Sequence, residues 1–271
     1  MPLRRTRRIM AIALVGWQVV AAVHGEEVAG EPIDAQFVSR YDESTQKYVM
    51  IFPDDAKRKS YDLLIALHGH GSDRWQFVNS DRGEVKAARD AARRYQMIYV
   101  SPDYRAKTSW MGPAAEADMV QLIELLKRKR PIGKVIVCGA SMGGSSALTF
   151  AALHPGLVDG VVSMNGTANH LEFANFQEAI SASFGGSKRE KLTQYKRRSA
   201  EYWPEKLTMP IALTTGGMDR SVPPESVLRL AEVLRQLERP VFLIHREEIG
   251  HFTTYDDACD AFEYVLKQVV R

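Results

Sequence analysis

The sequence predicts an α/β protein with a mostly parallel central sheet flanked by helices. Predicted strands alternate with predicted helices after residue 60, which is typical of strands joined by crossover helices. Apolar residues make up 45% of the 271-residue chain, enough for one large core. The two cysteines, Cys138 and Cys259, are too few for a disulfide framework, and we expect two buried free thiols.

The elements follow one another along the chain with a single interruption. Strands are predicted at 48–52 (antiparallel), 63–67, 97–101, 135–138, 158–164, 210–215 and 241–245, and helices at about 83–95, 114–130, 145–153, 224–237 and from 254. Pro131 ends the second of these helices. Residues 165–206 break the alternation, and a connection of this length is typical of a lid or binding loop. We therefore expect a small cap insertion at 165–206.

Residues 1–25 have the parts of a secretory signal peptide. Arginines at 4, 5, 7 and 8 form a basic start, residues 9–23 are apolar, and small residues precede Glu26. An apolar stretch of 15 residues is shorter than the roughly 20 needed to span a bilayer. The sequence thus predicts a cleaved leader, a single domain over 26–271 and a secreted or periplasmic protein. A retained anchor and twin-arginine export stay open as alternatives.

The charge balance gives no reason to expect a nucleic-acid partner. The full chain has 36 basic and 33 acidic residues, a net charge of +3. The leader holds four of the arginines and no acid, which leaves 32 against 33, or −1, after cleavage. The basic run at 127–130 ends a helix, where cations suit the helix dipole. We expect neither nucleic-acid binding nor stable membrane insertion after cleavage.

The most informative motif is Gly139-Ala140-Ser141-Met142-Gly143, which follows the apolar strand at 135–138. A Gly-x-Ser-x-Gly turn between a strand and a helix is a nucleophile elbow. The glycines remove side chains that would collide with the strand and the helix, and the turn lifts the serine hydroxyl above the sheet. The next backbone N–H, that of Met142, then lies at a helix start, where it can stabilise an oxyanion.

Two later residues complete a catalytic triad in the order serine, acid, histidine. Asp219 follows the strand at 210–215 and would orient the histidine, although an Asx turn before a Pro-rich loop would also explain it. His251 follows the last strand and would accept the proton from Ser141.

The loop after the strand at 63–67 reads His68-Gly69-His70-Gly71. The backbone N–H of His70 is the candidate for the second oxyanion donor, with Met142. A His-x-His metal pair is the alternative, but no third ligand with suitable spacing accompanies it, and we expect no metal and no organic cofactor. Trp110 and Trp75 lie on the same side of the predicted sheet, and either could stack on a flat substrate or be a rim or core residue.

The motifs around Gly71, Ser141, Asp219 and Gly250-His251 resemble those of the α/β-hydrolase superfamily over roughly residues 40–271. Within it the chain is similar to compact bacterial feruloyl esterases, acetyl-xylan esterases and polyhydroxybutyrate depolymerases, and to the catalytic core of prolyl oligopeptidases. His70 departs from this pattern, because such esterases often carry a small or apolar residue there, and its side chain could line the pocket.

The resemblance implies an exported serine hydrolase that cleaves carboxylic esters, small or on a polysaccharide, through an acyl-enzyme. A serine peptidase of the prolyl-oligopeptidase type is the alternative within enzymes, although such enzymes usually carry a large additional domain. A non-catalytic binding protein on the same fold is the alternative of another class. The acyl group, the alcohol and the oligomeric state are not specified by the sequence.

Overall fold

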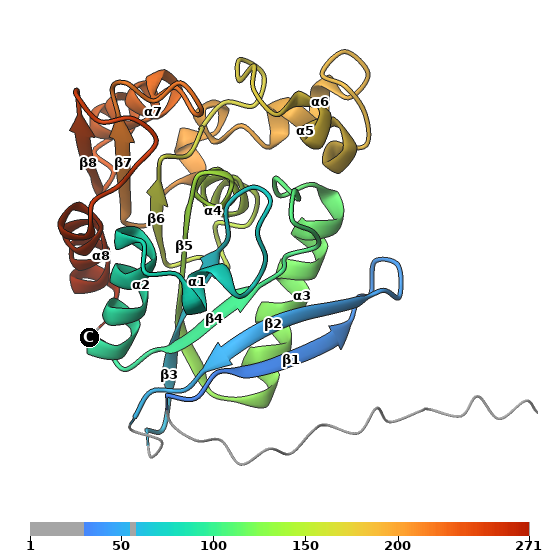
Figure 1. Cartoon of the computed structure of the whole chain (residues 1–271), viewed down its shortest axis with the longest axis vertical. Helices are drawn as coiled ribbons and strands as arrows, with labels where there is room; N and C mark the ends of the chain where they lie inside the picture. Colours follow the sequence, from blue (N-terminus) through green and yellow to red (C-terminus); the bar gives the residue numbers. More distant parts are fainter. Residues whose placement is uncertain (1–29, 55–57, 271) are drawn as a thin grey trace, which may run out of the picture.

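The computed structural model describes residues 30–54 and 58–270, so the predicted signal peptide lies outside the described residues. Eight strands form one sheet in the order β1-β2-β4-β3-β5-β6-β7-β8 (Figure 1). The strands are β1 (Ile33–Val38), β2 (Thr45–Ile51), β3 (Tyr61–Leu67), β4 (Ile98–Pro102), β5 (Ile132–Ala140), β6 (Gly160–Met164), β7 (Ile211–Gly216) and β8 (Val241–Arg246). Pairing is antiparallel between β1 and β2 and between β2 and β4, and parallel from β4 to β8.

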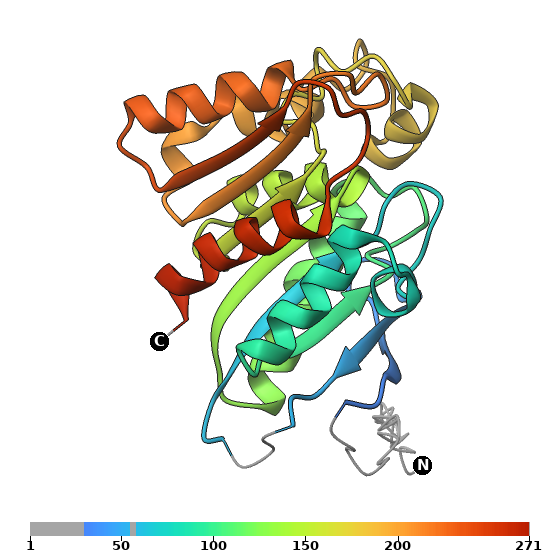
Figure 2. The ribbon, with the colours of Figure 1, turned by 60° about the vertical axis from the view of Figure 1, so that its left-hand side comes forward.

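Helices cover both faces of this sheet. They are α1 (Gln76–Asn79), α2 (Gly83–Arg94), α3 (Pro113–Lys129), α4 (Met142–Leu153), α5 (Gln177–Phe184), α6 (Leu192–Arg197), α7 (Glu225–Gln236) and α8 (Tyr255–Val269), with 3₁₀ turns η1 (Ala200–Tyr202) and η2 (Pro204–Lys206). In Figures 1 and 2, α2 and α8 lie side by side on one face, and they pack against each other. The predicted α/β-hydrolase architecture is confirmed.

The side chains of the central strand β3 belong to two hydrophobic cores, one on each face of the sheet. Successive side chains of a strand point to opposite faces. Leu63, Ile65 and Leu67 belong to the core beneath α3, α4 and α7, whereas Leu64 and Ala66 belong to the core beneath α2 and α8. All five are fully buried. A parallel strand covered on both faces is therefore apolar throughout, as the run at 63–67 is.

Most elements lie within a few residues of their predicted bounds, and the exceptions are informative. Strand β1 was not predicted, because Ile33–Val38 is half-buried and mixes polar with apolar residues, and its pairing with β2 fixes it. Helix α4 begins at Met142 rather than at 145, directly after the serine. Cys138 and Cys259 are free thiols, as predicted, with Cys138 buried and Cys259 only partly so.

The connection between β6 and β7 contains the residues predicted to form a cap, 165–206, which we call the cap segment. It holds α5, α6, η1 and η2, and it contacts α4 and α7. Phe173, Phe184 and Tyr195 are buried and pack it onto the core, whereas Phe176 and Tyr202 are exposed. None of the helices in the described part of the chain is both long and apolar enough to cross a bilayer.

Candidate active site

Ser141 occupies a strained turn between β5 and α4. Its backbone has φ 58° and ψ −121°, a conformation that side-chain-bearing residues rarely adopt. Its N–H donates to the carbonyl of Met164 on the neighbouring strand β6, at 2.8 Å, which holds the turn in place. The strain at this residue is thus stabilised by the sheet beside it, as an elbow requires.

The two flanking glycines are required by backbone contacts. A Cβ on Gly139 would lie 2.5 Å from the carbonyl carbon of Gly143. A Cβ on Gly143 would lie 2.7 Å from the carbonyl carbon of Leu67, and closer still to its oxygen. Real Cβ atoms essentially never approach so closely. The motif therefore lets β5, α4 and the end of β3 meet at one point.

The structure brings Ser141, His251 and Asp219 together. The imidazole Nε2 of His251 lies 2.9 Å from the Oγ of Ser141, and its Nδ1 lies 2.6 Å from Oδ2 of Asp219. The side chain of Asp219 is 1% exposed, whereas that of His251 is 28% exposed. A buried carboxylate, a half-buried imidazole and a hydroxyl are thus arranged as a continuous path for proton transfer.

Asp219 combines the two roles that its sequence context allowed. Its Oδ1 accepts hydrogen bonds from the backbone N–H groups of Ser221 and Val222, both at 2.9 Å, which is an Asx turn. Its Oδ2 faces His251. The turn therefore fixes the carboxylate, and the free oxygen orients the imidazole.

Close packing of two loops joins the acid to the histidine. The N–H of Gly217 donates to the carbonyl of Arg246 at 2.9 Å, and the N–H of Met218 to that of Ile249 at 3.0 Å. A Cβ on Gly217 would lie 2.6 Å from the carbonyl oxygen of Glu247. Only a residue without a side chain allows the loop after β7 to lie against the loop after β8.

The loop after β3 is pinned beside the elbow. The N–H of Gly69 donates to Oε1 of Gln76 at 2.7 Å, and that of Gly71, at φ 82°, donates to the carbonyl of Lys107 at 2.8 Å. The N–H groups of His70 and Met142 donate to no residue that the structure describes. These are the two predicted oxyanion donors.

His68 and His70 occupy different surroundings. His68 is fully buried, and its ring nitrogens lie 2.9 Å and 3.2 Å from the carbonyl oxygens of Gly69 and Asp103. Burial lowers the pKa of both imidazoles. Within residues 30–54 and 58–270, no group of three or more His, Cys, Asp and Glu side chains could hold a metal ion.

Trp110, expected as a possible stacking surface, is fully buried. Its indole Nε1–H donates to Nδ1 of His70 at 3.1 Å, and its ring packs against Phe173 and Phe176 of the cap segment. Direct stacking of Trp110 on a substrate disagrees with this burial, because the cap segment already covers the ring. Trp75 is half-buried beside Arg74, and its contact with substrate stays a prediction.

Sequence reasoning missed three exposed apolar side chains, those of Met218, Phe252 and Phe176, which we call the apolar rim. Met218 is 63% exposed and precedes Asp219, Phe252 is 48% exposed and follows His251, and Phe176 is 37% exposed on the cap segment. The signal was the adjacency of two large apolar residues to predicted catalytic ones on loops.

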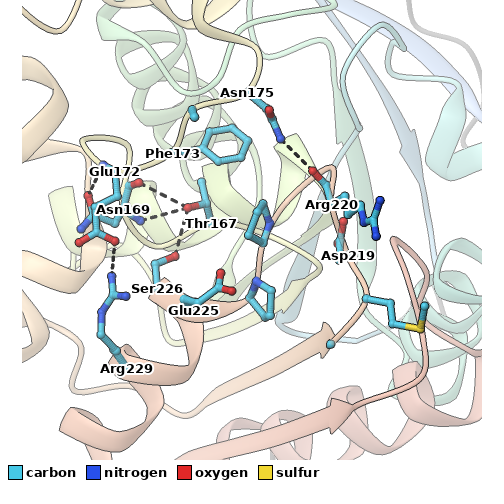
Figure 3. A pocket seen from close by; sticks show the side chains of 15 residues that line it. Thr167, Asn169, Glu172, Phe173, Asn175, Asp219, Arg220, Glu225, Ser226 and Arg229 are labelled. Atoms are coloured by element: carbon cyan, nitrogen blue, oxygen red, sulfur yellow. Dashed lines mark hydrogen bonds and ion pairs between the residues drawn. The ribbon is translucent and has the colours of Figure 1, made fainter.

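A cavity of about 800 Å³ lies between the cap segment and the loop that carries Asp219 (Figure 3). Its wall includes Phe173 and Met218 together with charged side chains of Glu172, Arg220 and Arg229. The side-chain amide of Asn175 donates to the carbonyl oxygens of Arg220 and Ser221, at 2.9 Å and 3.0 Å. The cap segment is therefore tied directly to the loop that holds the acid.

The sequence matches a known protein family. The model of the prolyl oligopeptidase family matches residues 107–267, more than half of the chain. No curated protein matches the sequence significantly.

Similar solved structures include both stand-alone hydrolases and peptidases. Fluorophosphonate-binding serine hydrolase F of Staphylococcus aureus is 16% identical with a TM-score of 0.67, and the match covers 90% of this chain and 100% of that one. The S-formylglutathione hydrolase of the same organism is 15% identical with a TM-score of 0.67, over 89% and 99%. A puromycin-hydrolyzing peptidase of Mycobacterium tuberculosis is 16% identical with a TM-score of 0.69, over 89% of this chain but 39% of that one. At these identities the likeness shows the fold.

Proposed function

The chain belongs to the prolyl oligopeptidase family of serine hydrolases, and from this premise we propose that it is an exported esterase that cleaves carboxylic esters through an acyl-enzyme. The observation that carries the proposal is the continuous path from Ser141 through His251 to Asp219. A binding protein on the same fold would have no need of these three groups at hydrogen-bonding distance.

The first half of the reaction forms the acyl-enzyme. Nε2 of His251 accepts the proton of the Ser141 hydroxyl as Oγ attacks the acyl carbon, and the carboxylate of Asp219 stabilises the imidazolium. The carbonyl oxygen becomes an oxyanion that accepts hydrogen bonds from the N–H groups of His70 and Met142. When the tetrahedral intermediate collapses, the C–O bond breaks and His251 returns the proton to the departing alcohol.

The second half repeats the proton transfers with water. His251 accepts a proton from a water molecule as its oxygen attacks the acyl carbon of the ester on Ser141, and the same two N–H groups bind the second oxyanion. Collapse releases the carboxylic acid and restores the serine hydroxyl. Apart from the departing alcohol, all proton donors and acceptors in this cycle are protein groups or water.

The apolar rim supports an ester over a peptide as substrate. Met218 and Phe252, each next in sequence to a triad residue, and Phe176, in contact with His70, offer exposed apolar side chains, which suit an acyl chain or an aromatic alcohol. The family itself favours a serine peptidase as the second candidate.

Three matched pairs of esters and anilides separate the two candidates. Residues 26–271 would be assayed with 4-nitrophenyl acetate, butyrate and octanoate and with the matching 4-nitroanilides, which differ only in the scissile bond. We expect Ser141-dependent turnover of the esters and no Ser141-dependent turnover of the anilides. Anilide turnover that is lost in Ser141→Ala would establish the peptidase instead, whatever the ester rates, because an activated ester is intrinsically more reactive than the matching anilide.

A fluorophosphonate probe tests the serine mechanism independently of the substrate. Covalent labelling of the intact protein, absent in Ser141→Ala, is expected because the probe reacts only with an activated serine. If no ester or anilide is cleaved and no label is found, a binding role replaces the enzyme. The preferred chain length among the esters would measure the acyl pocket.

Export and a polysaccharide substrate are the finer parts of the proposal. The basic and apolar parts of residues 1–25 support export, and N-terminal sequencing of protein recovered from the periplasm or medium would test it. A start near Glu26 is expected, whereas a start at Met1 would indicate a retained leader. Release of acetate from acetylated xylan, compared with Ser141→Ala, would test the polysaccharide.

A further inference from the structure

His70 has an imidazole that takes no part in the proton transfers. Its Nδ1 lies 3.1 Å from the indole Nε1 of Trp110, and its Nε2 makes no hydrogen bond to any residue that the structure describes. The ring is half-buried against Phe176, at 4.6 Å between ring centroids. One face of the imidazole is thus held by the protein, and one nitrogen is free.

The bond to Trp110 decides which nitrogen carries the proton. An indole N–H can only donate, so Nδ1 of His70 must be the acceptor and must lack a proton. In the neutral ring the proton then resides on Nε2, the free nitrogen. Burial lowers the pKa of His70, which keeps the ring neutral. Trp110 itself is fully buried and fixed by Phe173 and Phe176, so the imidazole is also fixed in orientation.

This oriented N–H belongs to the loop beside the nucleophile elbow. Strands β3 and β5 are neighbours, with Leu67 opposite Gly139, and His70 and Ser141 follow them by three and two residues. An ideal Cβ on Gly69, the residue before His70, would lie 3.7 Å from the carbonyl oxygen of Ala140, the residue before Ser141. The residue that supplies a backbone N–H to the proposed oxyanion hole thus carries a second donor on its side chain.

We propose that the Nε2–H of His70 is a specificity-determining donor for substrates with an acceptor oxygen beside the scissile ester, such as an ether or hydroxyl oxygen, and that Trp110 is its positioning residue. The inference rests on the proposed esterase function. It names the substrate class as oxygen-bearing esters, of which sugar esters are one kind, in preference to esters of plain hydrocarbon chains. An unpaired donor beside the reacting carbonyl disfavours a hydrocarbon there, because the N–H loses its partner in water.

Isosteric substrate pairs test the donor and locate the oxygen. On the acyl side, 4-nitrophenyl methoxyacetate replaces one CH₂ of 4-nitrophenyl butyrate by oxygen. On the alcohol side, 2-methoxyethyl acetate does the same to n-butyl acetate. The measured quantity is the ratio of kcat/KM for the oxygen ester to that for the hydrocarbon ester. Comparing this ratio between wild type and His70→Leu cancels the intrinsic reactivity of each ester.

We expect His70→Leu to lower the ratio about threefold to tenfold in one of the two arms, the loss of one neutral hydrogen bond. The arm that responds identifies the side of the substrate that carries the oxygen. His70→Asn, which keeps an N–H donor, should retain part of the ratio. An unchanged ratio in both arms would overturn the proposal even if every ester is hydrolysed, whereas failure of all esters and of the fluorophosphonate would instead overturn the proposed function.

Trp110→Phe tests the positioning role, because phenylalanine fills most of the space without a donor. Trp110→Phe should lower the ratio of kcat/KM for the oxygen ester to that for the hydrocarbon ester when His70 is present. The substitution should leave this ratio unchanged when it is combined with His70→Leu, since the indole acts only through the imidazole. A merely structural role would lower activity equally in both backgrounds. Should Trp110→Phe fail to fold, the ¹⁵N chemical shifts of the His70 ring in the wild-type protein decide. An Nε2-protonated tautomer is expected, and an Nδ1-protonated one would overturn the proposal.

Discussion

Replacing Gly143 by alanine tests whether the elbow depends on the backbone contact between α4 and β3. The new Cβ would lie 2.7 Å from the carbonyl carbon of Leu67 and 2.9 Å from the carbonyl oxygen of His68. Ordinary contacts begin near 3.4 Å, so relieving the 2.7 Å contact alone requires a separation of about 0.7 Å, and the oxygen of Leu67, which is closer still, requires more. Both contacts are with backbone, which has no rotamer to change.

This separation moves the serine relative to the loop that carries His70. A misplacement of about 1 Å can cost about 100-fold in rate, so kcat/KM should fall about 10- to 100-fold. Overpacking of a filled site costs about 1–3 kcal/mol in the free energy of unfolding, which corresponds to several degrees in Tm for a domain of this size. Steady-state hydrolysis of 4-nitrophenyl acetate and a thermal melt followed by circular dichroism measure both effects.

Gly156→Ala is the matched control, because it makes the same chemical change where no atom lies within 4 Å of the new Cβ. Its kcat/KM should equal that of the wild type, and its Tm should be unchanged or slightly raised. Wild-type activity and Tm in Gly143→Ala would refute the argument, since the chain would then accommodate at no cost a contact that we regard as forbidden.

Three further outcomes are expected. Asp219→Asn should lower kcat about 10⁴-fold while keeping the Asx turn, because the amide favours the wrong imidazole tautomer; a loss of only a few-fold in the same ester assay would leave Asp219 with its turn role alone. Burial, and then the charges of Arg198 and Lys188, lowers the pKa of His170 from 6.5 to about 3, so below pH 6.5 the unfolded chain binds a proton that the folded one refuses. The free energy of unfolding should therefore fall as pH falls from 6.5 toward 3, by up to about 1.4 kcal/mol per pH unit. Urea titrations at several pH values should show that this free energy falls less steeply with pH in His170→Asn than in the wild type. An equal pH dependence in the two proteins would mean that His170 is already charged in the folded state. Ester turnover should be unchanged by a chelator and abolished by a fluorophosphonate, because the groups that transfer protons belong to the protein. Loss of turnover in the presence of the chelator would indicate a metal-dependent reaction.

The sequence predicts those parts of the site that depend on local backbone demands. The elbow glycines, the strand before Ser141 and the turn at Asp219 each leave a mark on a few consecutive residues. The chain order of the triad then leaves two of the seven histidines, His245 and His251, and only His251 follows the last strand. The distances of 2.6 Å and 2.9 Å within the triad follow from the packing of two loops against each other, which no local pattern specifies.

The surroundings of Trp110 show why other parts escaped prediction. Its place after a strand indicated the correct side of the sheet, but its burial depends on Phe173 and Phe176, more than 60 residues away in the cap segment. Strand β1 likewise exists because β2 lies beside it, and its own residues favour a strand only weakly. Contacts between distant segments decide both cases.

The position of β8 links the onset of chemical activity to the end of folding. His251 follows β8, which lies at the edge of the sheet beside β7, and its partner Ser141 lies 110 residues earlier. A chain emerging from the ribosome completes its nucleophile long before its base. Until the final strand joins the sheet, Ser141 has no base beside it and is an ordinary alcohol, so the unfinished protein has no activated serine.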